Sequence, residues 1–288
     1  MTCAMTDFEP RRGYWRPPLL WRVLQRLARV MTALVARLRV TGDVPDELRR
    51  GPLILAGNHI GNFDPIALAA ATHVVGVHPR IMATGGLFRA PIVGSALRAC
   101  GHIRVNRTRI SADEARAAAA IDEAAIALAE RSVVAGYPEG RITLDPGMWP
   151  ERGRSGMARL ALTTGATVVP VAQWGSHEIL RYQVSSALWR TLWRDVRRRP
   201  VIRVHFGKPV DLSGLDPAAR GDVRRATDRI IAALRDELIA LRPDEPDLPH
   251  FADPSRTVET RRSFGSPPPV LDVRGDDLPG ASQSQQAS

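Results

Sequence analysis

Short apolar runs alternate along this chain with longer segments in which apolar residues recur at helical spacing. The runs with the length of buried strands lie at residues 53–56, 80–83, 102–105, 133–137, 168–172 and 201–206. Helical spacing occurs between most of them, at residues 65–73, 87–100, 111–130, 155–164 and 222–241. This rhythm predicts an α/β fold, with a mostly parallel sheet covered by helices.

The segment from residue 17 to residue 40 predicts an amphipathic helix with a basic stripe. The arginines near one helical face are Arg22, Arg26, Arg29 and Arg37. This helix is too charged for a membrane span but suits the headgroup region of a bilayer. A helix packed on the domain core, with its arginines in water, fits the pattern equally well. A second stretch, residues 188–199, places tryptophans beside arginines and favours the membrane interface.

The two ends of the chain differ from its middle. Beyond residue 243, few apolar residues, the prolines 267–269 and a Ser/Gln-rich ending predict a disordered acidic tail. We therefore expect three parts. They are an N-terminal amphipathic, membrane-associating segment (1–45), an α/β domain (46–243) and the tail (244–288).

Charge is distributed unevenly between these parts. Eight acids and four arginines fall between residues 244 and 288, a net charge of −4, which leaves +14 on the first 243 residues of a chain that totals +10. A basic body implies an anionic partner: nucleic acid, a phosphorylated small molecule or an anionic membrane surface. Aromatic residues make up only 5% of the chain and no nucleic-acid-binding motif is present, so we expect no nucleic-acid partner.

Cysteine usage and the N-terminus indicate the compartment. Cys3 and Cys100 form neither a disulfide framework nor a C-x-x-C pair, so we expect a reducing cytoplasmic setting without structural zinc. The apolar stretch that starts at Leu19 is interrupted by arginines and has no small-residue cleavage site. We therefore expect that the protein is neither exported nor processed.

A histidine and an aspartate separated by four residues, His59 and Asp64, follow the first apolar run. A neutral imidazole can accept a proton from an alcohol near pH 7, and a carboxylate on its other nitrogen fixes the tautomer. The same residues also resemble a helix start, because Asp64 precedes Pro65 and an apolar-periodic run. Taken alone, this motif fits a helix cap better than a catalytic pair.

Three further motifs follow strands, where sites form in a parallel sheet. Arg107 ends the stretch 101–107, and Glu139, Gly140 and Arg141 lie in a tight loop after residue 137. Pro170 interrupts the apolar run 168–172. Because a proline cannot donate a ladder hydrogen bond, this run is expected at a sheet edge or in the wall of a pocket.

In this order and at these separations, the four motifs resemble those of the glycerolipid acyltransferases, most closely the bacterial 1-acylglycerol-3-phosphate acyltransferases. The resemblance covers roughly residues 20–240. It implies that His59 and Asp64 are catalytic and that Arg107 and Arg141 bind the phosphate of the acceptor. It also places Asn58, Glu139 and Gly140 in loops at the substrate site and Pro170 on the acyl side.

The chain departs from the family pattern at two positions. Serine is frequent where this chain has Gly61, and in the third motif Arg141 follows Gly140 directly instead of one residue later. A shift of one residue redirects a loop side chain, so the phosphate role is less secure for Arg141 than for Arg107. Arg154, Arg159 and Lys208 are possible substitutes, and each also fits a solvated surface charge.

The resemblance implies transfer of an acyl group from a thioester to the sn-2 hydroxyl of 1-acylglycerol 3-phosphate, which gives phosphatidic acid. His59 is expected to act as general base oriented by Asp64, with no covalent acyl-enzyme and no metal. We expect no cofactor, because acyl-CoA or acyl carrier protein is the co-substrate. Backbone N–H groups of residues 61–62 or 65–67 are candidate donors to the oxyanion. Asp64 is expected both to cap the helix and to orient His59.

The expected partners are a lysophospholipid acceptor, the acyl donor and an anionic membrane, with the protein peripheral on the cytoplasmic face. One alternative is another acceptor, such as glycerol 3-phosphate, another lysophospholipid or a lyso-aminolipid. A second is a catalytically silent lipid- or nucleic-acid-binding protein. Residues 174–178 either line the cleft or form a plain loop. The remaining histidines are expected to be surface or core residues: His73, His78, His102, His177, His205 and His250.

Overall fold

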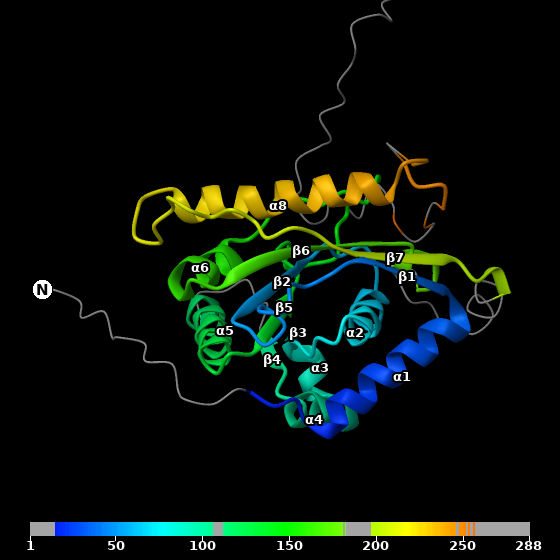
Figure 1. Cartoon of the computed structure of the whole chain (residues 1–288), viewed down its shortest axis with the longest axis horizontal. Coiled ribbons are helices and arrows are strands. Elements are labelled where there is room, and N and C mark those ends of the chain that lie inside the picture. Colours follow the sequence, from blue (N-terminus) through cyan, green and yellow to red (C-terminus); the bar gives the residue numbers. More distant parts are fainter. Residues whose placement is uncertain are drawn as a thin grey trace, which may run out of the picture.

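The chain folds as a sheet with helices on both faces (Figure 1). The computed structural model describes residues 15–105, 112–180, 182, 197–245, 248–251, 253 and 256, with residues 112–118 described by backbone alone. Within these residues seven strands form one sheet, in the order β1-β7-β6-β2-β5-β3-β4. The predicted α/β fold class is confirmed.

Strand direction decides where a site can form. In chain order the strands are β1 (Arg37–Gly42), β2 (Leu53–Gly57), β3 (Arg80–Thr84), β4 (Ile103–Val105), β5 (Val133–Gly136), β6 (Thr167–Trp174) and β7 (Val201–Phe206). All neighbouring pairs are parallel except β6 with β7. Trp174, at the end of β6, lies opposite Arg203, near the start of β7. The carboxyl ends of β2 and β6 therefore share one edge with the amino ends of β7 and β1.

The helices divide into two layers. They are α1 (Leu19–Val35), α2 (Asp64–Val74), α3 (Gly85–Arg89), α4 (Pro91–Ala99), α5 (Ala112–Ala129), α6 (Ser155–Thr164) and α8 (Asp222–Leu241), with the 3-10 turn η1 (Ser176–Glu178). α5, α6 and α8 cover one face of the sheet, and α2 with α1 covers the other (Figure 1). Because side chains alternate along a strand, Leu53 and Leu55 of β2 pack toward α2, whereas Ile54 and Ala56 pack toward α5, α6 and α8.

The helix predicted over residues 17–40 is wrong in its last part. α1 ends at Val35, and β1 begins at Arg37 and pairs with β7 along its whole length. In β1 the exposed arginines alternate with the half-buried Leu38 and Val40. A period of two suits a strand rather than a helix. The first strand of the sheet therefore lies inside the predicted N-terminal segment 1–45.

The helix predicted over residues 87–100 is two helices, α3 and α4. They meet at Ala90 and Pro91, and Ala90 has extended backbone angles. A proline disfavours the helical conformation in the residue before it and is well placed at the first position of a new helix. The break therefore follows from Pro91.

α1 packs on the domain through both apolar and polar side chains and leaves a second set of apolar residues exposed. Trp21, Gln25 and Thr32 are buried, and Gln25 Nε2 donates to Thr72 Oγ1 of α2 at 2.9 Å and to the Val77 carbonyl at 3.1 Å. The exposed apolar residues of this helix are Leu19, Leu20, Val23, Leu27, Val30, Met31 and Leu34. This outward apolar stripe is the reverse of what a helix on a soluble core presents.

Part of the segment predicted as a tail from residue 244 contacts the α/β domain. Glu245 Oε1 accepts a hydrogen bond from Trp174 Nε1 at 3.1 Å, and Asp253 is buried and accepts from the Tyr182 backbone N–H at 2.7 Å. The ring of Phe251 lies 6.0 Å from that of His177. The chain therefore returns from α8 onto the carboxyl end of β6, and residues 257–288 lie outside the described part.

Pro170 does not lie in an edge strand, so of its two expected places the sheet edge is wrong, and the pocket wall stays a prediction. β6 lies between β2 and β7, and its pairing with β7 begins only at Val171. The Pro170 carbonyl accepts from Gly207 N–H at 2.9 Å, just beyond the end of β7. Because the N–H and C=O of one residue point to the same side of a strand, the N–H that proline lacks would face Gly207, where the pairing of β6 with β7 ends.

Candidate active site

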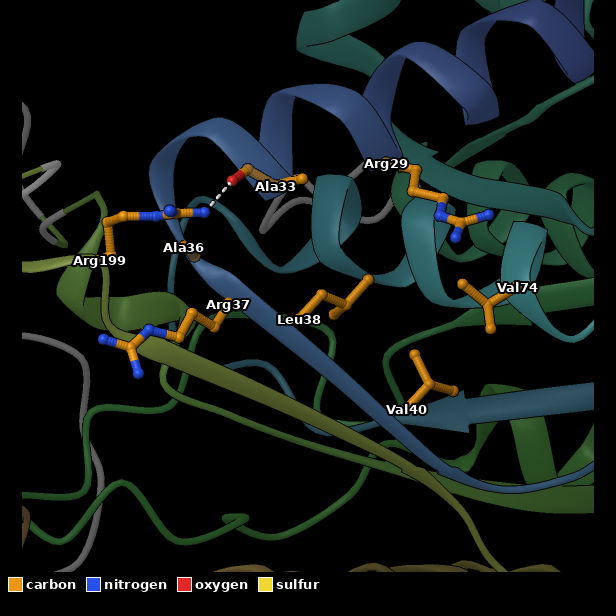
Figure 2. Close-up of a pocket in the computed structure, with 8 residues that line it drawn as sticks. All are labelled: Arg29, Ala33, Ala36, Arg37, Leu38, Val40, Val74 and Arg199. Atoms are coloured by element: carbon orange, nitrogen blue, oxygen red, sulfur yellow. Dashed lines mark hydrogen bonds between the residues drawn. The ribbon is translucent and has the colours of Figure 1, made fainter.

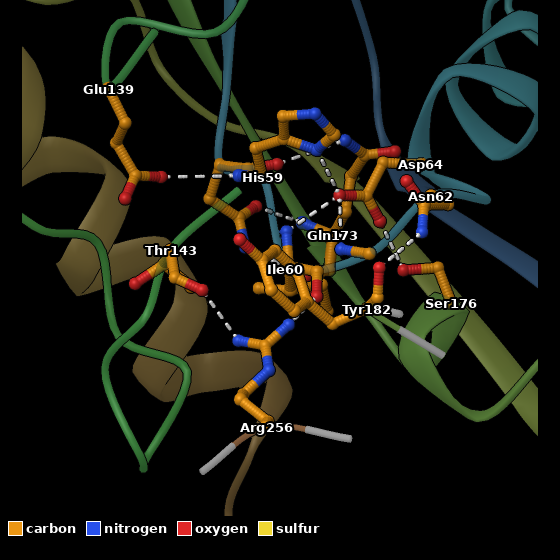
Figure 3. Close-up of polar contacts among 12 residues, drawn as sticks. His59, Ile60, Asn62, Asp64, Glu139, Thr143, Gln173, Ser176, Tyr182 and Arg256 are labelled. Carbon is orange, nitrogen blue, oxygen red and sulfur yellow. Dashed lines mark hydrogen bonds and ion pairs between the residues drawn. The ribbon is translucent and has the colours of Figure 1, made fainter. Parts of the chain in front are cut away.

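The turn after β2 brings the side chains of His59 and Asp64 together, as their spacing predicted (Figure 3). His59 Nδ1 lies 2.7 Å from Asp64 Oδ2. Asp64 is fully buried and His59 is 8% exposed. A carboxylate at Nδ1 places the imidazole proton on that nitrogen, which leaves the lone pair of Nε2 to accept a proton from a substrate.

Asp64 is held by hydrogen bonds to both of its oxygens. Oδ2 also accepts from the backbone N–H of Ile60 at 2.6 Å and of Gly61 at 2.9 Å. Oδ1 accepts from the hydroxyl of Ser176 in η1. A buried carboxylate needs such partners, because leaving it unpaired in a dry site is costly.

The expectation that Asp64 also caps α2 is wrong. Asp64 is the first residue of α2, Phe63 is the N-cap residue, and no side chain caps this helix end. The oxygens of Asp64 are bonded instead to the loop before the helix and to η1. The carboxylate therefore organises the turn that carries His59 rather than the helix that follows.

The N–H groups of Gly61, Ile66 and Ala67, three of the expected donors to an oxyanion, are already engaged. Gly61 N–H donates to Asp64, and the N–H groups of Ile66 and Ala67 donate to the Phe63 carbonyl at 3.0 Å. Pro65 has no N–H to give. The helix start therefore does not offer free donors at these positions.

The ring of Tyr137 stacks on the imidazole of His59. Their centroids are 4.1 Å apart with planes inclined by 15°. Burial, together with the negative charge of Asp64, raises the pKa of Tyr137 well above its ordinary value. The phenol therefore stays neutral and restricts the orientation of the His59 ring.

Glu139 joins the third-motif loop to His59. Its Oε1 accepts the His59 backbone N–H at 3.2 Å, and its Oε2 accepts the Glu151 backbone N–H at 2.9 Å. Burial raises the pKa of Glu139 to about 8. The Thr143 N–H donates to the His59 carbonyl at 2.7 Å, so the backbone of His59 is bound on both sides by this loop.

Asn58 fixes the end of β2 to β6. Its Oδ1 accepts from Gln173 N–H at 2.6 Å and its Nδ2 donates to the Gln173 carbonyl at 3.0 Å, while Gln173 Nε2 donates to the Asn58 carbonyl at 3.2 Å. These bonds continue the sheet beyond its last ladder pair and place His59 directly after a rigid strand end.

The predicted phosphate-binding arginines are not gathered at His59 by the described contacts. Arg141 pairs with Glu151 at 3.0 Å, and Arg107 lies outside the described residues. Gly140 has a φ of +70°, and a Cβ there would lie 2.8 Å from Arg154 Cδ, so Arg154 lies across this glycine. The phosphate roles of Arg107 and Arg141 stay predictions.

Residues 174–178 pack against the turn that carries His59 and Asp64, and their place in a substrate cleft stays a prediction. Besides Ser176, this stretch brings the backbone of His177 against Gly61. Burial lowers the pKa of His177 to about 4, and that of His102 likewise. His102 Nδ1 accepts from Ile81 N–H at 3.0 Å, so both rings are neutral core groups, as predicted.

Ser176 and Arg256 are among the residues of this site that escaped the sequence analysis. Ser176 lies in the stretch after β6 that drew attention, but no spacing links it to Asp64. Arg256 donates to the carbonyls of Ile60 and Thr143 (Figure 3), and it lies in the predicted tail. No local sequence pattern could have revealed either residue, because each contact joins residues more than 100 positions apart.

Metal-binding clusters and membrane-spanning helices are both absent from the described part of the chain. No group of three or more His, Cys, Asp and Glu side chains there is placed to hold a metal ion. None of the helices in that part is both long and apolar enough to cross a bilayer.

A family model described as Acyltransferase matches residues 37–174. The match runs from β1 to the end of β6 and includes His59, Asp64 and Glu139. The match covers a little less than half of the chain and agrees with the resemblance of its motifs to the acyltransferases.

The structure of the 1-acyl-sn-glycerophosphate (LPA) acyltransferase PlsC from Thermotoga maritima has a similar fold, with a TM-score of 0.55 and 16% sequence identity. The similarity covers 76% of this chain and 80% of that chain. At this identity the likeness establishes the fold alone.

Curated relatives are similar over part of the chain. An uncharacterized protein from Mycobacterium leprae is 31% identical over 141 residues, which are 45% of this chain and 34% of the relative. An uncharacterized protein from Mycobacterium tuberculosis is 31% identical over 155 residues, 50% of this chain and 38% of the relative. The matched region thus spans little more than a third of the length of these relatives.

Proposed function

We propose that the protein transfers an acyl group from a thioester to the sn-2 hydroxyl of 1-acylglycerol 3-phosphate. The observation that carries this proposal is the bond of 2.7 Å between His59 Nδ1 and the buried Asp64. It leaves Nε2 as the proton acceptor within the region that the acyltransferase family model matches. The choice of acceptor is supported by the fold shared with the LPA acyltransferase PlsC.

The reaction proceeds by direct attack. His59 Nε2 takes the proton of the acceptor hydroxyl as its oxygen bonds to the thioester carbonyl, and Asp64 stabilises the imidazolium that forms. When the tetrahedral intermediate collapses, the carbon–sulfur bond breaks and the imidazolium returns the proton to the leaving sulfur. The products are an ester and a free thiol, so no external oxidant, reductant or cofactor enters the balance.

The reaction needs no covalent acyl-enzyme. Cys100 is fully buried, and burial raises the pKa of its thiol, which disfavours the nucleophilic thiolate. Cys3 lies outside the described residues. The co-substrate is therefore acyl-CoA or acyl carrier protein, and its acyl group passes to the acceptor in one transfer.

Substrate binding is proposed for the loops that surround His59. Arg107 and Arg141 are the proposed phosphate ligands, because guanidinium binds phosphate oxygens in pairs. Asn58, Glu139 and Gly140 form the proposed loop wall. Pro170 is buried beside Ala56 in the sheet, close to the strand end that carries His59, on the proposed acyl side.

The second part of the proposal is peripheral binding to an anionic membrane on its cytoplasmic face. α1 presents an outward stripe of leucine, valine and methionine, while Arg22, Arg26 and Arg29 of this helix are also exposed. Apolar residues beside cationic ones are the composition that binds in a headgroup layer.

A basic groove beside α1 also supports binding to an anionic membrane through this side of the protein (Figure 2). The groove has a volume of about 370 Å³ and is lined by Arg29, Ala33, Ala36, Arg37, Leu38, Val40, Val74 and Arg199. Arg199 Nη2 donates to the Ala33 carbonyl at 2.7 Å, which ties the start of β7 to the end of α1. Its arginines add positive charge next to the apolar stripe.

A thiol-release assay on the purified protein tests the reaction and its rivals. Oleoyl-CoA is supplied with 1-oleoylglycerol 3-phosphate, glycerol 3-phosphate, lysophosphatidylcholine or a lyso-aminolipid in separate reactions. Fastest release with the first acceptor supports the proposal, and fastest release with another acceptor reassigns the substrate. If no acceptor releases thiol above the hydrolysis blank with either acyl-CoA or acyl carrier protein, the protein is a lipid-binding protein instead.

A further inference from the structure

Arg256 binds the two loops that carry the candidate site (Figure 3). Its Nη1 donates to the carbonyl of Thr143 at 2.7 Å, and its Nη2 donates to the carbonyl of Ile60. Thr143 belongs to the loop that follows β5, and Ile60 to the loop that follows β2. One guanidinium therefore joins loops that are more than 80 residues apart in the chain.

The same two residues bind the catalytic pair with their N–H groups. The Ile60 N–H donates to Asp64 Oδ2 at 2.6 Å, and the Thr143 N–H donates to the His59 carbonyl at 2.7 Å. Ile60 and Thr143 thus each accept a hydrogen bond from Arg256 with their C=O. With its N–H, Ile60 donates to Asp64 and Thr143 donates to His59. A displacement of either loop would alter the geometry of the His59–Asp64 pair.

We propose that Arg256 is a positioning residue of the active site, which acts by holding Ile60 and Thr143 where they fix Asp64 and His59. This inference rests on the proposed acyl transfer for its kinetic consequence. It extends the functional unit past residue 174, where the family match ends, into the segment that follows α8.

The chemistry of arginine suits this task. A guanidinium offers five N–H donors in a rigid planar fork, so it can reach two carbonyls in fixed directions, whereas a lysine ammonium acts as a compact point charge. Burial lowers the pKa of Arg256, while Asp253, Asp64, Tyr182 and Asp145 oppose that shift. A partly buried cation is costly unless it is well bonded, and here its bonds go to the loops of the site.

Arg242 offers a matched control. It is 2% exposed, donates from Nη1 to the Gly147 carbonyl at 2.7 Å, and its guanidinium lies about 4 Å from the rings of Trp149 and Trp174. Like Arg256 it donates to a backbone carbonyl, but its acceptor is neither Ile60 nor Thr143. Loss of either arginine should lower the melting temperature.

The kinetic test compares Arg256→Met with Arg242→Met in the full chain, below the melting temperature of both. For Arg256→Met we expect kcat to fall roughly 10- to 100-fold, with KM for both substrates within about twofold, because a misplaced catalytic group costs rate more than binding. Arg242→Met should keep the wild-type kcat for its folded fraction. A wild-type kcat in folded Arg256→Met would overturn the proposal.

If Arg256→Met does not fold, the variant Arg256→Lys takes its place in the kinetic test. Lysine keeps the charge but cannot reproduce the two-carbonyl fork, so we expect a folded protein with reduced kcat and unchanged KM. A wild-type kcat for Arg256→Lys would show that the fork is not needed and would also overturn the proposal.

A spectroscopic readout separates this inference from the proposed function. The proton between His59 Nδ1 and Asp64 gives a low-field resonance in the proton NMR spectrum, which needs no substrate. If wild-type protein transfers no acyl group, the proposed function fails, and a shift or loss of this resonance in Arg256→Met but not in Arg242→Met still supports the positioning role. An unchanged resonance in Arg256→Met contradicts it.

Discussion

The hydroxyl of Ser176 donates a hydrogen bond to Oδ1 of Asp64, the carboxylate oxygen that His59 does not use. The serine belongs to η1, directly after β6, and is fully buried. Where related first motifs often have a serine, this chain has Gly61. A hydroxyl from another part of the chain therefore reaches the catalytic pair.

Replacing Ser176 by alanine should lower kcat about tenfold, because a hydrogen bond to a charged group contributes about 1.5–3 kcal/mol and Asp64 would lose one of its anchors. Steady-state kinetics with 1-oleoylglycerol 3-phosphate and oleoyl-CoA measure this effect. Ser132→Ala is the matched control, since Ser132 is also buried and donates to the carbonyl of Ala127 in α5. Equal kcat values in the two variants would rule out a role for Ser176.

Replacing Gly61 by serine, the residue frequent at this position of the motif, should destabilise the protein. A Cβ at Gly61 would lie 3.1 Å from His177 Cα and 3.3 Å from its backbone N, and backbone atoms cannot move aside as a flexible side chain can. We expect Gly61→Ser to lower the free energy of unfolding by about 1–3 kcal/mol, measured by urea denaturation. In the control Gly86→Ser, a Cβ would meet nothing closer than Arg89 Nη2 at 3.9 Å. A loss no larger than that of the control would contradict this packing.

The raised pKa of Glu139 predicts a pH-dependent stability. Burial raises this pKa from 4.5 to about 8, so between those values the folded state keeps a proton that the unfolded state has lost. The contribution of Glu139 to stability is therefore present below the unfolded pKa and is lost as pH rises through this window, by about 1.4 kcal/mol per pH unit.

Urea denaturation of wild type and Glu139→Gln between pH 5 and pH 8 tests this slope. The glutamine cannot titrate, so the free energy of unfolding of the wild type should fall relative to the variant as pH rises. Groups other than Glu139 cancel in this difference. Parallel curves over the whole range would show that Glu139 titrates at an ordinary pKa.

The exposed stripe of α1 should determine binding to vesicles. We expect the double variant Leu27→Ser and Leu34→Ser to bind vesicles of anionic phospholipid roughly tenfold more weakly in flotation, because each change removes apolar area from the headgroup layer. Substitution is preferred to removal of residues 1–40, since β1 pairs with β7. The control Ile126→Ser with Ile239→Ser changes exposed residues of α5 and α8. Equal loss in both double variants would contradict a specific role for α1.

Much of the fold was predictable because its signals are local. The buried strands after β1 were recognised as short apolar runs, and α6 and α8 have the predicted bounds. β1 was missed because its arginines continue the basic stripe of α1, so the change from helical to alternating spacing was hidden. The split between α3 and α4 depended on Pro91, which could have been recognised as a helix start.

The candidate site was predictable only where its residues share a motif. Asp64 is the fifth residue after His59, and a single turn suffices to bring them together. Ser176 and Arg256 reach the same turn through the order of the strands and the return of the chain after α8, which no local pattern specifies. The assignment of a helix cap to Asp64 failed because Oδ2 binds His59, Ile60 and Gly61, which precede the helix, and Oδ1 binds Ser176, which is remote in the sequence.

The central claim is that His59 and Asp64 carry out acyl transfer, and thiol release by His59→Gln tests it most directly. With oleoyl-CoA and 1-oleoylglycerol 3-phosphate we predict that kcat falls roughly 10²- to 10⁴-fold, while the folded state persists by circular dichroism. Asp64→Asn should show a loss of the same kind. Turnover by folded His59→Gln within about threefold of the wild type would contradict the account.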